Sequence, residues 1–559
     1  MPFNNFLPQP PRVVLSKVIT VSLTAMLLAA GCKNGTTESS ATSNSTTQTT
    51  INNTMAARDN SINKTNAYND IFLDSADVEN FITQAKLDEN MAAAMRNFYN
   101  ARNYEYSWFT STGLTEQAFN FHSLFCTDNE KDVFSKSLER RLDKLREADD
   151  SATAINPKDA AIIKTELEVT EKFIQYANNN YKGVSVTALG TYMPVKKAAI
   201  LDLADTILAD SKKNRSYDAI NESYGELKGP LRKYTALAKS GGWPQITAGK
   251  KKYTVGATSP EIATIKKRLQ LTGELAGADT TDGFDATLQA AVKTYQQAHG
   301  YKPTGEITPP LIKDMNITAL ARVQQIVMNI ERMRWMPVNL TGRLILINIP
   351  EFELYVDSGK TTLFQMDVVV GKDGHNTTMF SGNLSQVVFS PYWNVPPSIV
   401  KKEILPGIAR NRHYLKDKDM EITGHEGGLP VVRQLPGPKN ALGKVKFLFP
   451  NSFDIYLHDT PDKGLFKKSS RDASHGCIRL SNPVKLANYL LQSQPTWTPE
   501  KIDSAMNAGV EQYVKVKNPV PVMITYYTAW VDDNHVLHFA DDIYSHDSKM
   551  AAKMFTNPQ

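Results

Sequence analysis

Apolar residues recur at helical spacing along roughly residues 70–245. One face of a predicted helix in this region is apolar and the other is charged. The apolar positions are Ile163, Leu167, Ile174 and Ala177, and the charged ones are Lys164, Glu168, Glu171 and Lys172. Breaks rich in Gly, Pro or Asn separate such segments, as at 182–183, 193–194 and 241–244. The pattern predicts an all-α region, to which we assign residues 70–250.

Residues 251–318 are predicted to form a second, smaller helical unit. Ile262, Ile265 and Leu269 recur at helical spacing, and Val292 and Tyr295 do so further on. An Asp-Gly-Phe-Asp turn at 282–285 lies between the two segments. These apolar positions suffice for a small core, so the unit could be a binding module or only a spacer.

The pattern becomes β-rich after a helical segment at 323–332. Runs at 344–347, 353–356 and 366–371 are rich in β-branched and apolar residues and are bounded by Gly, Pro and Asn. We assign residues 319–559 to a mainly β domain. The predicted fold class is therefore multidomain α+β.

A stretch from about 396 to 443 interrupts the strand pattern. It is rich in Pro, Gly and charge, and it separates the Tyr-Trp-Asn-Val-Pro-Pro segment at 392–397 from the next apolar run at 445–447. Insertions longer than ~12–15 residues are usually functional or disordered. We interpret this one as a capping insertion that acts as a lid.

The first 32 residues have the features of a signal peptide. Arg12 and Lys17 precede an uncharged run at 18–31, which is too short to cross a bilayer. The ending Leu-Ala-Ala-Gly-Cys resembles a bacterial lipoprotein signal, which implies lipidation at Cys32; the alternative is an ordinary cleaved signal. Residues 33–69 are mostly Ser, Thr, Asn and Gln, and this composition predicts a disordered tether.

Composition changes this picture little. The chain has 559 residues, 41% hydrophobic and 22% charged, which is typical of ordinary globular domains. Its net charge of +5 is too small on this length to indicate nucleic-acid binding. Of three cysteines, Cys32 is the candidate lipid site and Cys477 a candidate nucleophile, which leaves Cys126 with no obligate partner.

Candidate chemistry centres on Ser-His-Gly-Cys-Ile-Arg at 474–479. His458 lies nineteen residues before Cys477 and can serve as its general base. As imidazolium it would also stabilise the thiolate, because an unassisted thiol with a pKa near ~8.5 is only slightly ionised at neutral pH. Gly476 leaves room for an approaching carbonyl, and the N–H groups of Gly476 and Cys477 are candidate donors to an oxyanion.

The same residues resemble the signature of L,D-transpeptidases with a YkuD-type catalytic domain. The resemblance rests on His458-Asp459-Thr460 and on the 474–479 segment, and it extends from about 323 to 547. The 392–397 segment and Pro-Gly-Pro-Lys-Asn at 436–440 resemble the large subgroup with a capping loop. Residues 255–317 resemble the three-helix peptidoglycan-binding domain, and a weaker likeness to the helical scaffold of that subgroup begins at Tyr99.

The resemblance implies a role for each residue of the motif. Cys477 is the nucleophile, His458 the general base, and Asp459 orients the imidazole through its backbone carbonyl. His475 is a rival base, because positions i and i+2 of an extended segment face the same side, but the family admits arginine there. We therefore expect His475 to support substrate binding. The other expected substrate contacts are Tyr456, Ser474, Arg479 and Trp393.

The implied function is 3→3 crosslinking of peptidoglycan through a cysteine acyl-enzyme, with release of D-Ala and no cofactor. Expected partners are stem peptides, the membrane through the lipid on Cys32, and carbapenem-type covalent inhibitors, and the expected location is the periplasm. The rivals are an L,D-carboxypeptidase, an enzyme that attaches proteins to peptidoglycan, and an idle wall-binding protein. A zinc site at His458, His475 and Cys477 is disfavoured, because no H-E-x-x-H or C-x-x-C motif is present.

Overall fold

The computed structural model describes residues 55–128, 134–149, 154–180, 195–209, 222–247, 249–335, 342–359, 361–451 and 453–559. The predicted signal peptide, Cys32 and most of the predicted tether lie outside these residues. Everything described below belongs to one unit, Ile51–Gln559. Within the described residues, no helix is both long and apolar enough to cross a membrane.

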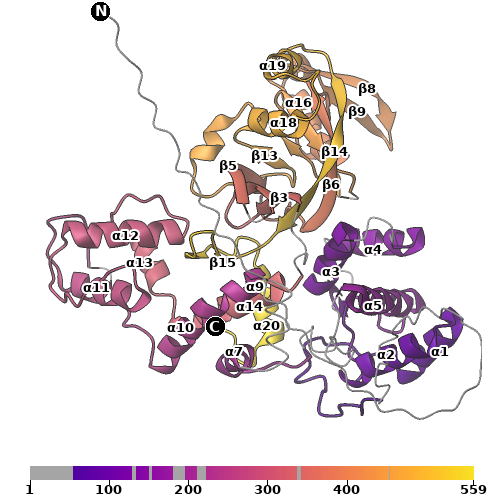
Figure 1. Cartoon of the computed structure of the whole chain (residues 1–559). Helices are drawn as coiled ribbons and strands as arrows, with labels where there is room; N and C mark the ends of the chain where they lie inside the picture. The colour runs from indigo at the N-terminus through magenta and orange to yellow at the C-terminus, as the bar shows by residue number, and fades with distance from the viewer. Residues whose placement is uncertain are drawn as a thin grey trace, which may run out of the picture. The chain divides into compact units, whose positions relative to one another are not determined.

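The N-terminal part is helical, as its periodicity predicts (Figure 1). The predicted amphipathic helix is α5, which buries Leu167, Ile174 and Ala177. A two-stranded hairpin, β1–β2, follows α2. The elements are α1 (Ser75–Ala85), α2 (Glu89–Asn100), β1 (Phe109–Thr110), β2 (Gly113–Leu114), α3 (Glu116–Asp128), α4 (Lys136–Asp149), α5 (Ala160–Asn180), α7 (Ile200–Leu208), α9 (Glu222–Glu226) and α10 (Lys228–Lys239).

The predicted tether ends earlier than residue 69. Ile62 is fully buried and Tyr68 is nearly so, and the Asp59 N–H donates to the Asn100 carbonyl at 2.9 Å. The sequence is polar here, but these two apolar side chains are enough to anchor the backbone to the scaffold. The chain is therefore packed against the scaffold before residue 69.

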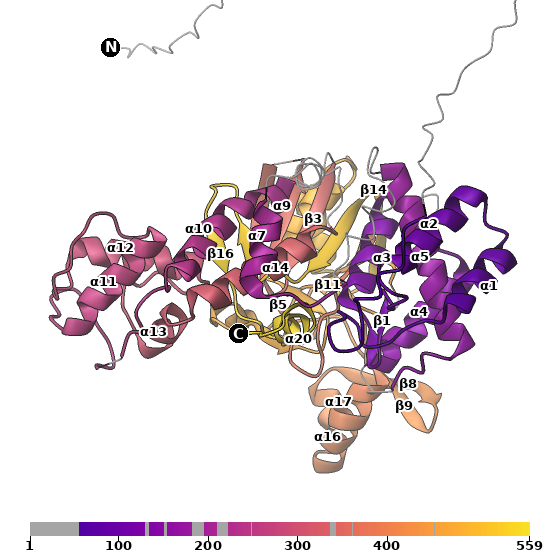
Figure 2. The ribbon, with the colours of Figure 1, turned by 90° about the horizontal axis from the view of Figure 1, so that it is seen from below.

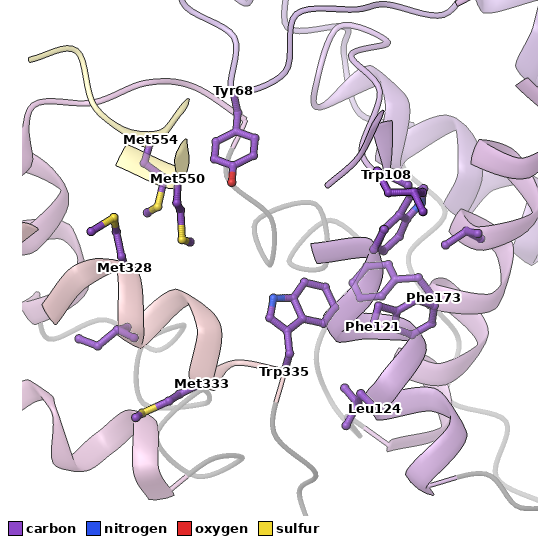
Figure 3. Packing of buried hydrophobic residues seen from close by; sticks show 14 of the residues in the cluster. Tyr68, Trp108, Phe121, Leu124, Phe173, Met328, Met333, Trp335, Met550 and Met554 are labelled. Atoms are coloured by element: carbon purple, nitrogen blue, oxygen red, sulfur yellow. The ribbon is translucent and has the colours of Figure 1, made fainter. Parts of the chain in front are cut away.

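The aromatic core of the scaffold also takes in the helix that follows the small unit. Trp108, Phe121 and Phe173 pack with ring centroids 5.4–5.6 Å apart, and Trp335 contacts Phe173 at 5.9 Å (Figure 3). Trp335 directly follows α14 (Ala319–Met333), a helix that the sequence pattern placed in the β domain. Met328 and Met333 of α14, with Met550 and Met554 of α20 (His546–Met554), belong to the same core.

The small unit has three helices around its own core. They are α11 (Pro260–Thr272), α12 (Ala286–Ala298) and α13 (Pro309–Met315). The five core residues predicted from periodicity, Ile262 to Tyr295, are all fully buried. Asp285 of the predicted turn caps α12 by accepting the Leu288 N–H at 2.8 Å.

The β-rich part contains a nine-stranded sheet in the order β12-β5-β13-β11-β10-β6-β14-β3-β4. Because β4 also pairs with β5, eight of the strands close into a ring, and β12 lies outside it on β5. The strands are β3 (Arg343–Asn348), β4 (Glu353–Ser358), β5 (Thr361–Gly371), β6 (Phe380–Phe389), β10 (Val445–Leu448), β11 (Leu457–His458), β12 (Asp472–Ser474), β13 (Ile478–Leu480) and β14 (Gln512–Thr525).

Helices and a hairpin complete this domain. The helices α18 (Pro483–Leu491) and α19 (Pro499–Met506) bury their apolar faces in the same core as the strands, and Figure 1 shows them beside β14. A 3-10 turn, η2 (Lys463–Lys467), lies in the loop between β11 and β12. The hairpin β15 (Ala529–Val531) and β16 (Leu537–Phe539) comes after β14.

The predicted insertion is a small folded lobe, which we call the cap (Figure 2). It has its own core of Val395, Ile399, Val400, Ile404 and Val432. Its sheet has the order β7-β9-β8. The elements are β7 (Trp393–Asn394), α15 (Pro397–Ile399), the π-helical turn η1 (Val400–Ile404), α16 (Leu405–Arg410), α17 (Tyr414–Asp417), β8 (Met420–Glu426) and β9 (Leu429–Gln434).

Candidate active site

Cys477 lies in the turn between β12 and β13 and is half-buried. It lines a cleft of about 1190 Å³ with residues of the cap and of the loop 374–379. Strand pairing fixes the turn, because β12 pairs with β5 on one side and β13 pairs in parallel with β11 on the other. The sheet therefore presents the thiol to the cleft from two anchored strands.

His458 ends β11, directly beside the strand that follows Cys477. It is 4% exposed, and its Nδ1 bonds the Asp459 carbonyl at 2.5 Å. A carbonyl can only accept, so Nδ1 carries the proton and the Nε2 of a neutral ring is left as an acceptor. The backbone position predicted to orient the imidazole thus makes that contact.

The Asp459 side chain is held on the other side of the strand. It accepts the Lys444 N–H at 2.9 Å and the Lys463 ammonium at 2.6 Å. Gly443 has φ +61°, and a Cβ there would lie 2.4 Å from the Asp459 carboxyl. A glycine at 443 is therefore needed for this close approach.

The resting site favours a neutral pair. Burial, helped by Arg479, lowers the pKa of His458 to about 3. Burial also raises the pKa of Cys477, against the hydrogen bonds of Tyr456. The thiol donates to the Asp454 carbonyl at 3.6 Å, and no hydrogen bond joins it to His458 in the described structure. Both shifts oppose the expected imidazolium–thiolate pair, because burial leaves each charged state poorly solvated.

Gly476 has a backbone conformation that favours glycine, but its N–H already donates a hydrogen bond to Ser474. Its φ is +110°, a value that favours glycine. The Gly476 N–H donates to the Ser474 hydroxyl at 3.2 Å, and the same hydroxyl donates to the Cys477 carbonyl at 2.6 Å. The expected use of the Gly476 N–H for an oxyanion is thus opposed by this contact. The Cys477 N–H makes no hydrogen bond within the described residues.

Two of the expected substrate contacts line the cleft. Tyr456 hydrogen-bonds Cys477, and burial raises its pKa well above the usual range. Its ring centroid is 5.8 Å from that of His458. His475 also lines the cleft, but its Nε2 lies 3.3 Å from Glu403 of the cap. Residues 475–477 form a bend and not a strand, so strand alternation does not apply to His475, although it lines the same cleft as Cys477.

The other three expected contacts lie outside the cleft lining. Ser474 is 2% exposed and clamps the turn. Arg479 is opposite His458 in the sheet, where burial lowers its pKa. Trp393 packs on the cap core, and its neighbour Tyr392 lines the cleft instead.

Sequence reasoning missed the loop 374–379, which forms part of the cleft. Its only signal is a polar Lys-Asp-Gly-His-Asn-Thr run between two β-rich segments. It also missed that scaffold residues such as Thr110 and Glu116, and Lys549 of α20, line the same cleft. Among the described residues, no group of three or more His, Cys, Asp or Glu is placed to hold a metal ion.

Three domain families match this chain. The model of the YkuD L,D-transpeptidase catalytic domain matches residues 342–522, and that of the "Scaffold domain" matches 93–231. The "Putative peptidoglycan binding domain" matches residues 258–315. All the candidate catalytic residues named above lie inside the first of these matches.

Individual proteins are similar over part of the chain. A curated "Putative L,D-transpeptidase" of Haemophilus influenzae is 30% identical over 271 residues, which cover 45% of this chain and 53% of that protein. The chain thus matches about half the length of that relative. An L,D-transpeptidase (Yku) structure from Stackebrandtia nassauensis is 11% identical and covers 50% of this chain and 97% of its own, with a TM-score of 0.21. One from Mycobacterium smegmatis is 14% identical and covers 33% and 58%, with a TM-score of 0.19.

The TM-scores of these two structures are too low to support residue equivalences. The assignment of the catalytic domain therefore rests on the domain matches and on the curated relative. The chain therefore carries a YkuD-type L,D-transpeptidase catalytic domain, preceded by a region that matches the scaffold domain and one that matches the peptidoglycan-binding domain.

Proposed function

We propose that this chain forms 3→3 crosslinks between peptidoglycan stem peptides. Cys477 attacks the carbonyl of the third residue of a tetrapeptide stem and D-Ala leaves. The acyl group then passes to the side-chain amine of a second stem. The observation that carries this proposal is a half-buried thiol beside a neutral histidine in a cleft of about 1190 Å³. This volume exceeds the ~300–1,000 Å³ of usual small-molecule sites, as two branched peptides require.

Each step moves one proton through His458. Its Nε2 takes the thiol proton as the Sγ–C bond forms, and it returns that proton to the nitrogen of D-Ala as the C–N bond breaks. In the second half, the incoming amine gives a proton to His458, which protonates the leaving Sγ. Since His458 starts neutral, it acts as a general base at the moment of attack. A stored thiolate is not required.

The cap supports transfer to an amine in preference to water. Tyr392, Val395 and Glu403 line the cleft from its side, and the contact of Glu403 with His475 connects the cap to the turn that holds Cys477. Water is present at high concentration, so a thioester in an open site would hydrolyse before a second stem arrived. A cover that excludes water gives the bound amine its advantage.

We further propose that the enzyme works in the periplasm, tethered to a membrane by lipid on Cys32. The support is the sequence Leu-Ala-Ala-Gly-Cys and the polar segment after it. Domains of this kind act on cell-wall material, which lies outside the cytoplasm. Metabolic labelling with a fatty-acid analogue tests the anchor, and label that persists in Cys32→Ser would contradict it.

The direct test of the function is a product analysis. Purified disaccharide-tetrapeptide is incubated with the full-length protein, and the products are weighed by mass spectrometry. We expect two products: a dimer whose mass is that of two monomers less one D-Ala, and free D-Ala. Cys477→Ala should give neither product. Tripeptide as the sole product would indicate an L,D-carboxypeptidase. Unchanged substrate would indicate an idle wall-binding protein or a different acyl donor.

A further inference from the structure

We propose that Thr377 is a positioning residue that aims the Cys477 N–H at the oxyanion formed during acyl transfer. Its hydroxyl donates to the Gly476 carbonyl at 2.8 Å, across 99 residues of sequence. Thr377 is 2% exposed and belongs to the loop 374–379 that sequence analysis did not identify. This inference rests on the proposed acyl chemistry of Cys477, but not on which acceptor takes the acyl group.

The hydrogen bonds of the turn at 475–477 leave one backbone N–H, that of Cys477, without a partner among the described residues. The Gly476 N–H and the Cys477 carbonyl are both taken by Ser474, and the Gly476 carbonyl is taken by Thr377. The Cys477 N–H makes no hydrogen bond among the described residues. Backbone N–H groups are nearly always paired, so an unpaired one on a cleft-lining residue is available to a ligand or a transition state.

The hydrogen bond from Thr377 to the Gly476 carbonyl determines the direction of the Cys477 N–H. The Gly476 carbonyl and the Cys477 N–H belong to the same trans peptide unit, in which the C=O and N–H bonds are antiparallel. Holding the oxygen against Thr377 therefore directs the N–H away from Thr377. Glycine at φ +110° has access to other conformations, so the peptide needs such a restraint to keep one orientation.

Thr377 is itself held in one rotamer and one hydroxyl orientation. The Gly371 N–H donates to its Oγ1 at 2.9 Å, which leaves the single hydroxyl proton for Gly476. The Thr377 N–H lies 3.4 Å from the Tyr544 hydroxyl, and that hydroxyl donates to the Gly371 carbonyl. A Cβ at Gly371 would lie 2.0 Å from the His375 carbonyl, so only glycine lets the loop fold back this closely.

The test separates oxyanion stabilisation from thiol reactivity. Full-length Thr377→Val, which keeps the shape but loses the hydroxyl, is compared with Thr377→Ser, which keeps the hydroxyl. Acylation by p-nitrophenyl acetate passes through a tetrahedral oxyanion, whereas alkylation by iodoacetamide does not. Rates measured on Cys477→Ala are subtracted to remove reaction elsewhere on the chain. Both probes act without peptidoglycan, so the test stands apart from the proposed crosslinking.

We expect Thr377→Val to lower the acylation rate about 10- to 100-fold and to change alkylation less than about twofold. Thr377→Ser should restore acylation to within about threefold of the wild type. Equal losses in both reactions would show that Thr377 acts on the thiol or on the fold. An unchanged acylation rate in Thr377→Val would show that the Thr377 hydroxyl does not orient the Cys477 N–H. Either result overturns the proposal.

A second variant and an NMR signal keep the test decisive if Thr377→Val does not fold. Thr377→Ala removes the same hydroxyl with less bulk, and it replaces Thr377→Val if circular dichroism shows the latter unfolded. The chain has three cysteines, so ¹⁵N-cysteine labelling gives few amide signals, and Cys477→Ala identifies the one from residue 477. That signal should move in Thr377→Val or Thr377→Ala and stay in Thr377→Ser. A signal unmoved in both hydroxyl-free variants contradicts the inference.

Discussion

The protonation states of two residues decide how the thiol reacts. Burial favours the neutral forms of both Cys477 and His458, and the imidazole Nδ1 is held by the Asp459 carbonyl, which leaves Nε2 as an acceptor. A neutral base beside a neutral thiol transfers the proton during attack. The thiol is therefore protected from unspecific reaction until a substrate carbonyl is in place.

The two histidines near Cys477 should differ sharply in importance. His458→Ala removes the proton carrier, so we expect single-turnover acylation to fall about 10²- to 10⁴-fold. His475→Ala removes a side chain that contacts Glu403 of the cap, and the loss should stay below about tenfold. Rapid-mixing mass spectrometry of both variants measures the rates. The reverse ranking would make His475 the base.

The pH dependence follows from the directions of the two pKa shifts. Burial raises the Cys477 pKa above its usual range, so alkylation by iodoacetamide should still be rising at about pH 9. The His458 pKa is lowered to about 3, so its base form is present throughout the range from about pH 5 to 8. Acylation should therefore show no acid limb near pH 6.5 due to His458. An alkylation plateau below pH 8 would contradict the neutral resting pair.

At the scale of elements, the cap is a folded lobe and not a loose loop. It has five buried apolar residues of its own and a three-stranded sheet. Its segment 392–403 lines the cleft, whereas the tip of the β8–β9 hairpin does not. The proposed covering function is thus assigned to the segment 392–403, and the hairpin tip provides an internal control.

Replacing residues 396–443 by a short Gly/Ser loop should lower the ratio of crosslinked dimer to hydrolysed tripeptide. The thiol should remain reactive to iodoacetamide, because Cys477 sits on the sheet and not on the cap. The control variant shortens only the hairpin tip at 426–428, and its product ratio should match the wild type. A folded cap-deleted enzyme with the wild-type ratio would show that the cap does not exclude water.

Elements that are determined by the residue pattern of their own segment could be predicted, and features that depend on contacts between distant segments could not. Helix α5 and the three helices of the small unit follow from periodicity, and the first strands follow from β-branched runs. The closure of the sheet by β4 on β5 and the packing of α14 into the scaffold depend on contacts distant in sequence. No pattern indicates them.

The candidate site divides in the same way. Cys477, Gly476 and His458 stand in a motif, so the sequence alone predicts them as candidates. Whether Ser474 clamps the turn or Thr377 holds its carbonyl is decided by hydrogen bonds that only the fold creates. Arg479 was assigned to substrate by strand alternation and Trp393 from its segment's resemblance to the capping-loop subgroup, and neither is among the residues that line the cleft.

For the whole molecule, the scaffold and the ends of the catalytic domain share one core. That core runs from the scaffold helices through α14 to the C-terminal α20 (Figure 3). At its edge, Arg332 of α14 contacts Glu116 of α3 at 2.6 Å and Asp547 of α20 at 2.5 Å. Glu116 also lines the cleft, so the scaffold is part of the catalytic structure.

Arg332→Met should lower the midpoint of thermal unfolding by on the order of 10 °C, because it removes the cation that pairs with the buried Asp547 and the half-buried Glu116. The control is Arg96→Met, which breaks the exposed pair with Glu79 and should shift the midpoint by less than about 3 °C. Differential scanning calorimetry measures both. Equal shifts would mean that the buried pair does not hold the domains together.

The acyl-enzyme itself tests the central claim most directly. The full-length protein is mixed briefly with disaccharide-tetrapeptide, quenched in acid and weighed intact, and the adduct is then mapped by proteolysis. We expect an added mass equal to the substrate less D-Ala, carried by Cys477 and absent from Cys477→Ala, and a carbapenem should add its full mass at the same residue. An adduct that persists in Cys477→Ala, or dimer formation by Cys477→Ala, would contradict the account.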